Sequence, residues 1–485
     1  MNKTTFHTTA LSVSVLLMFS ACRQEVLPPQ AVGPVPDENQ LAWHEREQYA
    51  FVHFTTNTFT DKEWGYGDES PDIFNPAAFD AAQWARTVRD AGLKGIILTC
   101  KHHDGFCLWP SAYTEHSVRH SPFREGKGDV VKEVADACRR YGLFFGVYLS
   151  PWDRNFAQYA SPEYITYYRN QLTELLDNYG EVSEVWFDGA NGGDGYYGGA
   201  REQRKIDNRT YYDWPNTHAL VRRLAPRAMM FSDAGPDIRW CGNERGLAGE
   251  TNWCTISGDT LYPGKPDITA LLNTGSEDGN AWIPAEVDVS IRPGWFYHET
   301  ENDRVRTPEN LFALYLQSVG RGANLLLNLP PDRRGLIHEN DVQALLGWKK
   351  MLDEAFADNL AVRAVATADT YRGKAARYAA SCVTDGDRDT YWATDDGVTT
   401  GSLELDWGNR RKISHVVIQE YIRLGQRVKA FDVEAKKGDA WEKVSGGTTI
   451  GYKRILSLEG VETSALRIRI TDAKACPLIS NVEVY

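Results

Sequence analysis

The chain has 485 residues, which is too many for one ordinary hydrophobic core and predicts about two or three domains. Hydrophobic residues make up 42% and charged residues 25%, as in soluble globular proteins. The formal net charge of -13 argues against a nucleic-acid partner, which requires a basic surface.

The first 22 residues have the pattern of an export signal. Residues 10–19 are apolar and follow Lys3, but the run is too short to span a bilayer as a mature helix. It ends in Phe19-Ser20-Ala21-Cys22, which resembles a bacterial lipobox. The resemblance implies cleavage before Cys22 and lipidation of its sulfur, with residues 23–40 as a linker. The mature protein is then exported and anchored by lipid in a bacterial envelope, in the periplasm or at the cell surface. An ordinary secretory signal is the alternative.

Residues 41–357 alternate between short apolar runs and helical patterns. The predicted strands cover 49–54, 94–100, 143–149, 185–187, 228–231, 287–291 and 324–329, and the predicted helices 77–91, 130–141, 162–179, 216–224, 308–319 and 340–355. This alternation predicts an α/β fold, a (β/α)8 TIM-like barrel, with one further strand between residues 231 and 287. An open doubly wound sheet is the alternative, and the absence of a glycine-rich phosphate turn disfavours it.

The pattern changes after residue 358. Short alternating strands follow one another at 403–407, 412–419, 430–435, 465–471 and 481–485, with no long helix between them. Residues 358–485 are therefore predicted to form a separate all-β sandwich of ordinary domain size.

Asp188 ends one of the predicted buried strands, in the stretch Glu184-Val-Trp-Phe-Asp188-Gly189-Ala190. Taken alone, this carboxylate has an even chance of only capping the turn that follows it. In a barrel, however, the carboxyl end of a strand is where active-site residues gather. The other strand ends decide between these interpretations.

Polar and aromatic residues recur at or just beyond the other strand ends. They are His53, Glu63, Trp64, His102, His103, Tyr148, Glu244 and Trp295. Imidazoles, aromatic rings and two carboxylates suit a sugar and the cleavage of its acetal. The alternatives are a metal site built on the histidines, which also needs a close-set carboxylate, a surface-turn role for Glu244, and core packing for the two tryptophans.

Five motifs resemble the signatures of glycoside hydrolase family 29, the retaining α-L-fucosidases, over residues 41–355. They are His53-Phe-Thr-Thr-Asn-Thr-Phe59, Glu63-Trp64-Gly65, Lys101-His-His-Asp-Gly-Phe106, Tyr148-Leu-Ser150 and Trp186-Phe-Asp-Gly189. In addition, Gly242-Asn243-Glu244 resembles the branch that cleaves α-1,3- and α-1,4-linked fucose from branched, Lewis-type oligosaccharides.

The resemblance implies roles for these residues and no cofactor in catalysis. Asp188 would be the nucleophile and Glu244 the general acid/base, with Glu250 as the reserve candidate. His53, Glu63, Trp64, His102, His103 and Tyr148 would hold fucose, Trp295 would face its C6 methyl group, and Arg239 would contribute to a subsite. A non-catalytic glycan-binding lipoprotein on the same scaffold, or a retaining glycosidase for another sugar such as an α-galactoside, remain the alternatives.

The C-terminal domain has a resemblance of its own. The run from Val383 to Trp392, Val-Thr-Asp-Gly-Asp-Arg-Asp-Thr-Tyr-Trp, resembles the early loop of discoidin-like, galactose-binding-type domains. The likeness implies a structural Ca²⁺ held by oxygen ligands from Asp385, Asp387, Thr390 and Glu483. Such a domain either binds carbohydrate or packs against the barrel, and the sequence leaves both open.

Overall fold

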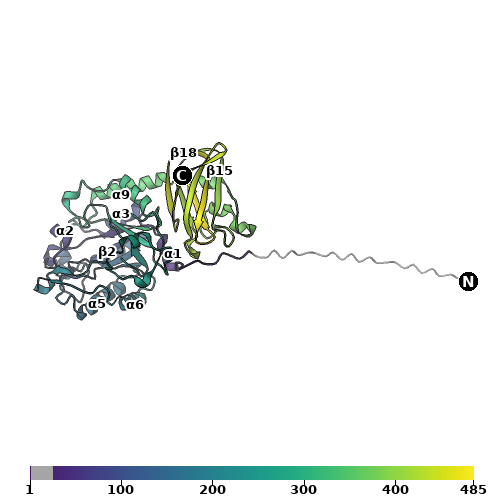
Figure 1. Ribbon diagram of the computed structural model, residues 1–485. Coiled ribbons are helices and arrows are strands. Elements are labelled where there is room, and N and C mark those ends of the chain that lie inside the picture. The colour runs from purple at the N-terminus through teal and green to yellow at the C-terminus, as the bar shows by residue number, and fades with distance from the viewer. Residues whose placement is uncertain (2–25) are drawn as a thin grey trace.

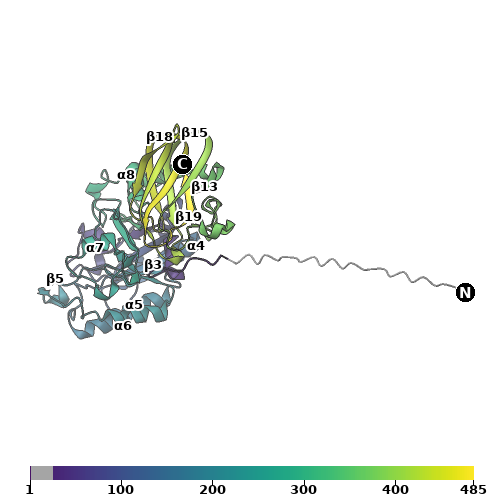
Figure 2. The same ribbon diagram turned by 45° about the vertical axis from the view of Figure 1, so that its right-hand side comes forward.

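The computed structural model describes residues 1 and 26–485, so the predicted signal segment and Cys22 lie outside the described residues. Figures 1 and 2 show two adjoining domains, a barrel coloured purple to green and a yellow sheet domain at the C-terminal end. In the part of the chain that the structure describes, no helix has both the length and the apolar character needed to cross a membrane.

The first domain is built on a closed barrel of parallel strands. In spatial order these are β1 (Gln48–Val52), β12 (Asn324–Asn328), β11 (Ala285–Ser290), β8 (Ile238–Trp240), β7 (Met229–Ser232), β4 (Glu184–Trp186), β3 (Phe144–Leu149) and β2 (Gly95–Lys101). Strand β1 pairs with both β2 and β12, which closes the ring. The predicted (β/α)8-type fold is confirmed. The strand that the sequence left unplaced is β8, in which the charged Arg239 separates Ile238 from Trp240, so no apolar run marks it in the sequence.

Helices surround the barrel. The longer ones are α3 (Ala81–Asp90), α4 (Val130–Tyr141), α5 (Pro162–Asn178), α6 (Trp214–Leu224), α8 (Pro308–Gln317) and α9 (Glu339–Ala355), and the shorter ones are α1 (Glu38–His44), α2 (Thr56–Thr60) and α7 (Thr269–Thr274). Helix α3 begins four residues later than its apolar pattern predicts, because the Asp80 side chain caps it by accepting from the Ala82 amide. The bounds of α4 match the prediction: Asp129 caps its start, and Gly142 ends it at a φ of 70°.

Two long connections carry small hairpins of their own. After β4 the chain forms β5 (Gly193–Gly195) and β6 (Glu202–Arg204), and between β8 and β11 it forms β9 (Thr255–Ile256) and β10 (Ala281–Trp282). Both connections leave the carboxyl ends of barrel strands. They are therefore placed to border whatever lies at that end of the barrel.

The C-terminal domain consists of antiparallel strands, which confirms the predicted all-β domain. Its strands are β13 (Val365–Ala368), β14 (Trp392–Ala393), β15 (Gly401–Glu420), β16 (Val428–Lys437), β17 (Ala440–Gly447), β18 (Arg454–Ala473) and β19 (Leu478–Val484). The two strands predicted at 403–407 and 412–419 are parts of β15, joined across a register shift between Asp406 and Arg411. Trp392, Phe431 and the branched aliphatic residues of these strands form its core.

Candidate active site

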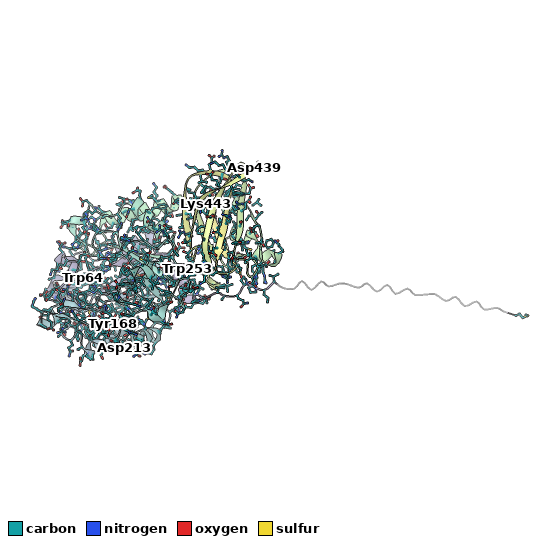
Figure 3. The ribbon with its side chains drawn as sticks, in the orientation of Figure 1. Trp64, Tyr168, Asp213, Trp253, Asp439 and Lys443 are labelled. Carbon is teal, nitrogen blue, oxygen red and sulfur yellow. The ribbon has the colours of Figure 1, made fainter. Side chains whose placement is uncertain are left out.

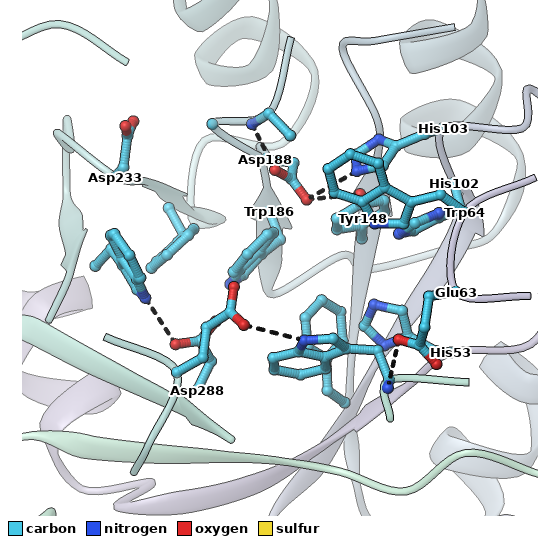
Figure 4. Close-up of a pocket in the computed structure, with 17 residues that line it drawn as sticks. His53, Glu63, Trp64, His102, His103, Tyr148, Trp186, Asp188, Asp233 and Asp288 are labelled. Atoms are coloured by element: carbon cyan, nitrogen blue, oxygen red, sulfur yellow. Dashed lines mark hydrogen bonds and ion pairs between the residues drawn. The ribbon is translucent and has the colours of Figure 1, made fainter. Parts of the chain in front are cut away.

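A pocket of about 260 Å³ opens at the carboxyl ends of the barrel strands. Figure 4 shows the histidines, Glu63 and Trp64 on one side and Asp233 and Asp288 on the opposite side. All nine residues predicted from the strand ends line it: His53, Glu63, Trp64, His102, His103, Tyr148, Asp188, Glu244 and Trp295. The barrel thus brings together residues that lie more than 200 positions apart in the chain.

Asp188 follows β4 and both caps a turn and faces the pocket. Its Oδ1 accepts from the Ala190 amide at 2.7 Å, which is the turn-capping bond that the sequence allowed. Its Oδ2 accepts from the Tyr148 hydroxyl at 2.8 Å and lies 3.8 Å from His103 Nε2. The carboxylate is therefore held by two donors in a fixed rotamer, with one oxygen directed at the pocket wall formed by β2 and β3.

The hydrogen bonds of His103 fix its tautomer. Its Nδ1 lies 2.7 Å from the Ser150 hydroxyl oxygen, and that hydroxyl donates its proton to the Trp152 carbonyl at 2.6 Å. A carbonyl can only accept, so Ser150 has no proton for the imidazole and His103 Nδ1 must be the donor. Burial lowers the pKa of His103, although the nearby Asp188 opposes this. A neutral His103 therefore presents the lone pair of Nε2 toward Asp188 and the pocket.

His53 is fixed in the same way. The Asn328 amide donates to the Trp295 carbonyl at 2.8 Å, so its oxygen is the atom that lies 2.8 Å from His53 Nδ1 and accepts from it. Burial lowers the pKa of His53 to about 3, and it also lowers the pKa of His102 well below its usual value. At neutral pH this wall consists of uncharged imidazoles, which suit sugar hydroxyls better than they suit an anion.

Glu63 holds the Trp295 loop as well as facing the pocket. Its carboxylate accepts from the backbone amides of Trp295 at 2.8 Å and Phe296 at 3.2 Å, and it lies 2.6 Å from His298 Nε2. Burial lowers the pKa of His298, but the bonds to Glu63 and Asp61 outweigh it and the net shift is upward. Glu63 therefore fixes where the Trp295 ring stands, 5.2 Å from the ring of His53.

Glu244 lies at the mouth of the pocket, in the connection after β8, with an exposed side chain. Its Oε2 accepts from the Trp295 indole nitrogen at 3.2 Å. Partial burial raises its pKa; the negative charges of Asp188 and Glu63 add to this, and the indole hydrogen bond opposes it. A carboxyl group with a raised pKa near a second carboxylate is the arrangement of a proton donor beside a nucleophile.

Two further carboxyl groups line the pocket and were not predicted. Asp288, on β11, accepts from the Trp240 indole nitrogen at 2.8 Å, and burial raises its pKa well above the usual range. Asp233 follows β7, and burial raises its pKa to about 6 although the Gly264 amide donates to it at 2.7 Å. Asp233 follows its strand just as Asp188 follows β4, so the same strand-end rule identifies it. Asp288 is signalled by a polar residue inside an apolar strand.

Arg239 does not line the pocket, and the expectation that it forms part of a subsite is not met. Side chains alternate along a strand, so Arg239 lies on the opposite face of β8 from Ile238 and Trp240. Those two face the barrel interior and the pocket, whereas Arg239 is fully buried behind the strand. Its guanidinium donates to the Leu272, Ile283 and Trp253 carbonyls and to the Asn252 side chain. Glu250, the reserve acid/base, is also outside the pocket and pairs with Arg321 and Arg454.

The predicted metal ligands do not form a cluster. Among residues 26–485, no group of three or more His, Cys, Asp or Glu side chains is arranged to hold a metal ion. Asp385 accepts from Thr390 at 2.8 Å, Asp387 accepts from the Asp389 amide, and Glu483 accepts from Asn481 and Tyr485. Asp385, Asp387 and Glu483 therefore do not meet in a cluster, and calcium stays a prediction from the resemblance alone.

Comparison with known proteins agrees with this geometry. Residues 28–354 match the α-L-fucosidase family and residues 365–483 match the F5/8 type C domain. The chain is 41% identical to α-L-fucosidase 1 of Arabidopsis thaliana over 463 residues, covering 94% of this chain and 88% of that one.

Two solved structures are also similar. A glycoside hydrolase 29 family member from an unknown rumen bacterium is 46% identical, with a TM-score of 0.85 over 94% of this chain and 78% of that one. A Ruminococcus gnavus GH29 fucosidase in complex with fucose is 34% identical, with a TM-score of 0.85 over 95% and 96% of the two chains. The shared sequence and the shared barrel, which carries the pocket described above, place this chain in the α-L-fucosidase family, glycoside hydrolase family 29.

Proposed function

We propose that the protein is a retaining exo-α-L-fucosidase that removes α-1,3- and α-1,4-linked fucose from branched, Lewis-type oligosaccharides. The observation that carries the proposal is the pairing of two carboxyl groups with different surroundings in one pocket. Asp188 is held by donors from Tyr148 and Ala190, whereas the pKa of Glu244 is raised. Family membership makes fucose the sugar, and the Gly242-Asn243-Glu244 motif favours the linkage.

The proposed reaction is a double displacement. Asp188 attacks the anomeric carbon while Glu244 gives its proton to the departing glycosidic oxygen, which leaves fucose covalently bound to Asp188. Glu244, now ionised, takes a proton from water, and the resulting nucleophile attacks the same carbon and releases Asp188. Tyr148 supports both steps, because its hydrogen bond to Oδ2 leaves the direction of the carboxylate fixed before and after the bond forms.

The pocket wall supports fucose as the bound sugar. The neutral His53 and His103 each offer an Nε2 lone pair to a hydroxyl, and Trp295 offers an apolar face to the C6 methyl group. A related R. gnavus fucosidase has been solved in complex with fucose. The small volume of the pocket favours a single terminal sugar, in keeping with an exo mode of action.

Incubation with 1,2-, 1,3-, 1,4- and 1,6-linked fucosyl oligosaccharides, beside chromogenic fucoside and galactoside, tests the proposal. We expect fucose release from the 1,3- and 1,4-linked branched compounds and from the chromogenic fucoside. Fucose release from only the 1,2- or 1,6-linked compounds would refute the proposed preference for α-1,3 and α-1,4 linkages. Cleavage of the galactoside alone would favour the other-sugar alternative. Binding of fucosides without turnover would favour the non-catalytic glycan-binding lipoprotein.

We also propose that the protein is exported and anchored through lipid at Cys22. The support is the lipobox-like Phe19-Ser20-Ala21-Cys22 sequence alone. Expression in a bacterial host followed by membrane fractionation tests this: the wild-type chain is expected in the membrane fraction and the Cys22→Ser variant outside it. Equal distribution of the two would refute the anchor and favour an ordinary secretory signal.

A further inference from the structure

Hydrogen bonds hold the connection that carries Glu244 in place. At its start, the Asn243 and Asn273 amides both donate to the Leu247 carbonyl, at 2.9 and 3.2 Å, and Asn273 also donates to the Cys241 carbonyl at 2.9 Å. Glu244 therefore stands on a short loop, residues 241–247, whose two sides are tied together. The position of that loop over the pocket depends on what holds the segment that follows it.

Residues 248–254, which we call the following segment, lie between the two domains. On the barrel side, the Ala248 amide donates to the Gln317 carbonyl at 3.0 Å, and Arg321 donates to the Ala248 carbonyl at 2.8 Å. On the other side, the Thr448–Thr449 turn between β17 and β18 reaches over from the C-terminal domain. Figure 3 shows Trp253 at the border where the domains meet.

The contacts from the C-terminal domain converge on Glu250 and its neighbours. Arg454, at the start of β18, donates to the Glu250 carbonyl and to its carboxylate, each at 2.9 Å. Thr448 donates to the same carbonyl at 3.0 Å. The Asn252 amide donates to the Thr449 hydroxyl at 2.9 Å. Gln426 also accepts from the Cys254 amide at 2.7 Å.

Arg454 is only 4% exposed, and it is one of two arginines on a single carboxylate, since Arg321 binds the other oxygen of Glu250. An arginine that donates to both a carbonyl and a carboxylate fixes the direction of the chain as well as its position. Only residues 245–249 separate Glu250, which Arg454 binds, from Glu244. Within them, an added Cβ at Gly246 would lie 2.5 Å from Leu314, so the backbone lies directly against α8.

We propose that the C-terminal domain is a brace for the catalytic acid/base, with Arg454 as the positioning residue that acts through Glu250 on Glu244. The inference rests on the proposed role of Glu244. It assigns to the F5/8 type C domain a part in the chemistry of the barrel, and to Glu250 the role of an anchor. A displacement of about 1 Å in a reacting group can lower a rate about 100-fold, so the loss of such a brace has a measurable effect.

The test compares two substrates in the full-length protein. An aryl fucoside with an activated leaving group needs little protonation, whereas a fucosyl oligosaccharide needs the proton of Glu244 to leave. We expect Arg454→Met to lower kcat/KM for the oligosaccharide by about tenfold or more and to change that for the aryl fucoside by less than about twofold. In a Glu244→Ala background, Arg454→Met is expected to cause no further loss on the oligosaccharide, because the two changes remove the same contribution.

Lys453→Met is the matched control. Lys453 also crosses the domain boundary, to Glu47, and neighbours Arg454, but among the described residues its side chain makes no hydrogen bond or ion pair with residues 248–254. We expect it to leave the ratio of the two kcat/KM values unchanged. Should Arg454→Met fold poorly in a thermal melt, Thr448→Val is the second variant. It removes the bond to the Glu250 carbonyl and the bond that Thr448 accepts from the Thr251 hydroxyl, and it is expected to act in the same direction with a smaller effect.

Three results would overturn the proposed positioning role of Arg454 and the C-terminal domain. The first is an equal loss on both substrates in Arg454→Met, which indicates a structural role alone. The second is the same selective loss in Lys453→Met. The third is a further loss on adding Arg454→Met to Glu244→Ala. Absence of any fucosidase activity in the wild-type protein is a different result, since it would overturn the proposed function and the brace with it.

Discussion

Trp295→Phe is predicted to shift the alkaline limb of the pH profile to higher pH. The Trp295 indole donates to Glu244 Oε2 at 3.2 Å, and this bond stabilises the ionised carboxylate. Phenylalanine keeps an aromatic face in the pocket but has no donor. The ionised form of Glu244 then loses a partner, so its pKa, which burial already raises, rises further. The protonated acid therefore persists to a higher pH.

The size of the shift follows from the strength of that hydrogen bond. Hydrogen bonds to a charged group contribute about 1.5–3 kcal/mol when they are well buried. The Glu244 side chain is exposed and the bond is long, so solvent screening reduces this to about 0.5–1 kcal/mol. One pKa unit corresponds to about 1.4 kcal/mol, so the limb should move by about 0.4–0.7 units.

The assay is kcat/KM for a fucosyl oligosaccharide between about pH 4 and pH 9, which reports the groups that titrate in the free enzyme. Trp64→Phe is the control, since Trp64 is also an indole of the pocket wall but makes no hydrogen bond to Glu244 among the described contacts. Both variants are expected to bind the sugar less well, and only Trp295→Phe should move the limb. A limb that stays in place, or moves to lower pH, would refute the assignment of Glu244 as the acid.

Four further outcomes are expected. Asp188→Ala should abolish turnover while leaving fucose binding measurable by calorimetry; residual turnover near the wild-type rate would exclude it as the nucleophile. Glu244→Ala should slow oligosaccharide cleavage far more than aryl fucoside cleavage, and equal losses would point to another acid. Asp288→Asn should keep kcat/KM within about threefold, below about 0.7 kcal/mol, because burial raises the pKa of Asp288 and so favours the neutral carboxyl, which an amide mimics. A much larger loss would mean that Asp288 acts in its ionised form. Arg239→Ala should lower the free energy of unfolding, measured in urea, by at least about 3 kcal/mol, because four buried acceptors lose their donor. It should leave the fucose affinity of the folded protein unchanged.

The barrel was predictable because its parts have regular periods. Helix α4 has a capping aspartate, an apolar face and a terminal glycine, so its bounds follow from local rules. Strand β8 was not predictable, because Arg239 interrupts its apolar residues and the long connection after it has no regular pattern. Tertiary pairing with β7 and β11, rather than local preference, makes those residues a strand.

The site was predictable where residues stand at strand ends, since barrel topology brings such ends together. His102, His103 and Asp188 are examples. Arg239, which the family resemblance suggested for a subsite, lies within β8, where the alternation of side chains turns it away from the pocket that Trp240 lines. Asp288 lies within β11 and was missed, because the pairing that turns it inward depends on the neighbouring strands. The hydrogen bonds from the C-terminal domain to residues 250–254 had no signal in the sequence near Glu244.

The most direct test of the account is the covalent trapping of the proposed intermediate. A fluorinated fucosyl donor with a good leaving group slows both steps, the second enough for the fucosyl-enzyme to accumulate, and digestion followed by mass spectrometry locates the label. The account predicts one fluorofucosyl group on the peptide that contains Asp188, absent from the Asp188→Ala variant. A label on any other residue, or an active enzyme that forms no adduct, would contradict a double displacement through Asp188.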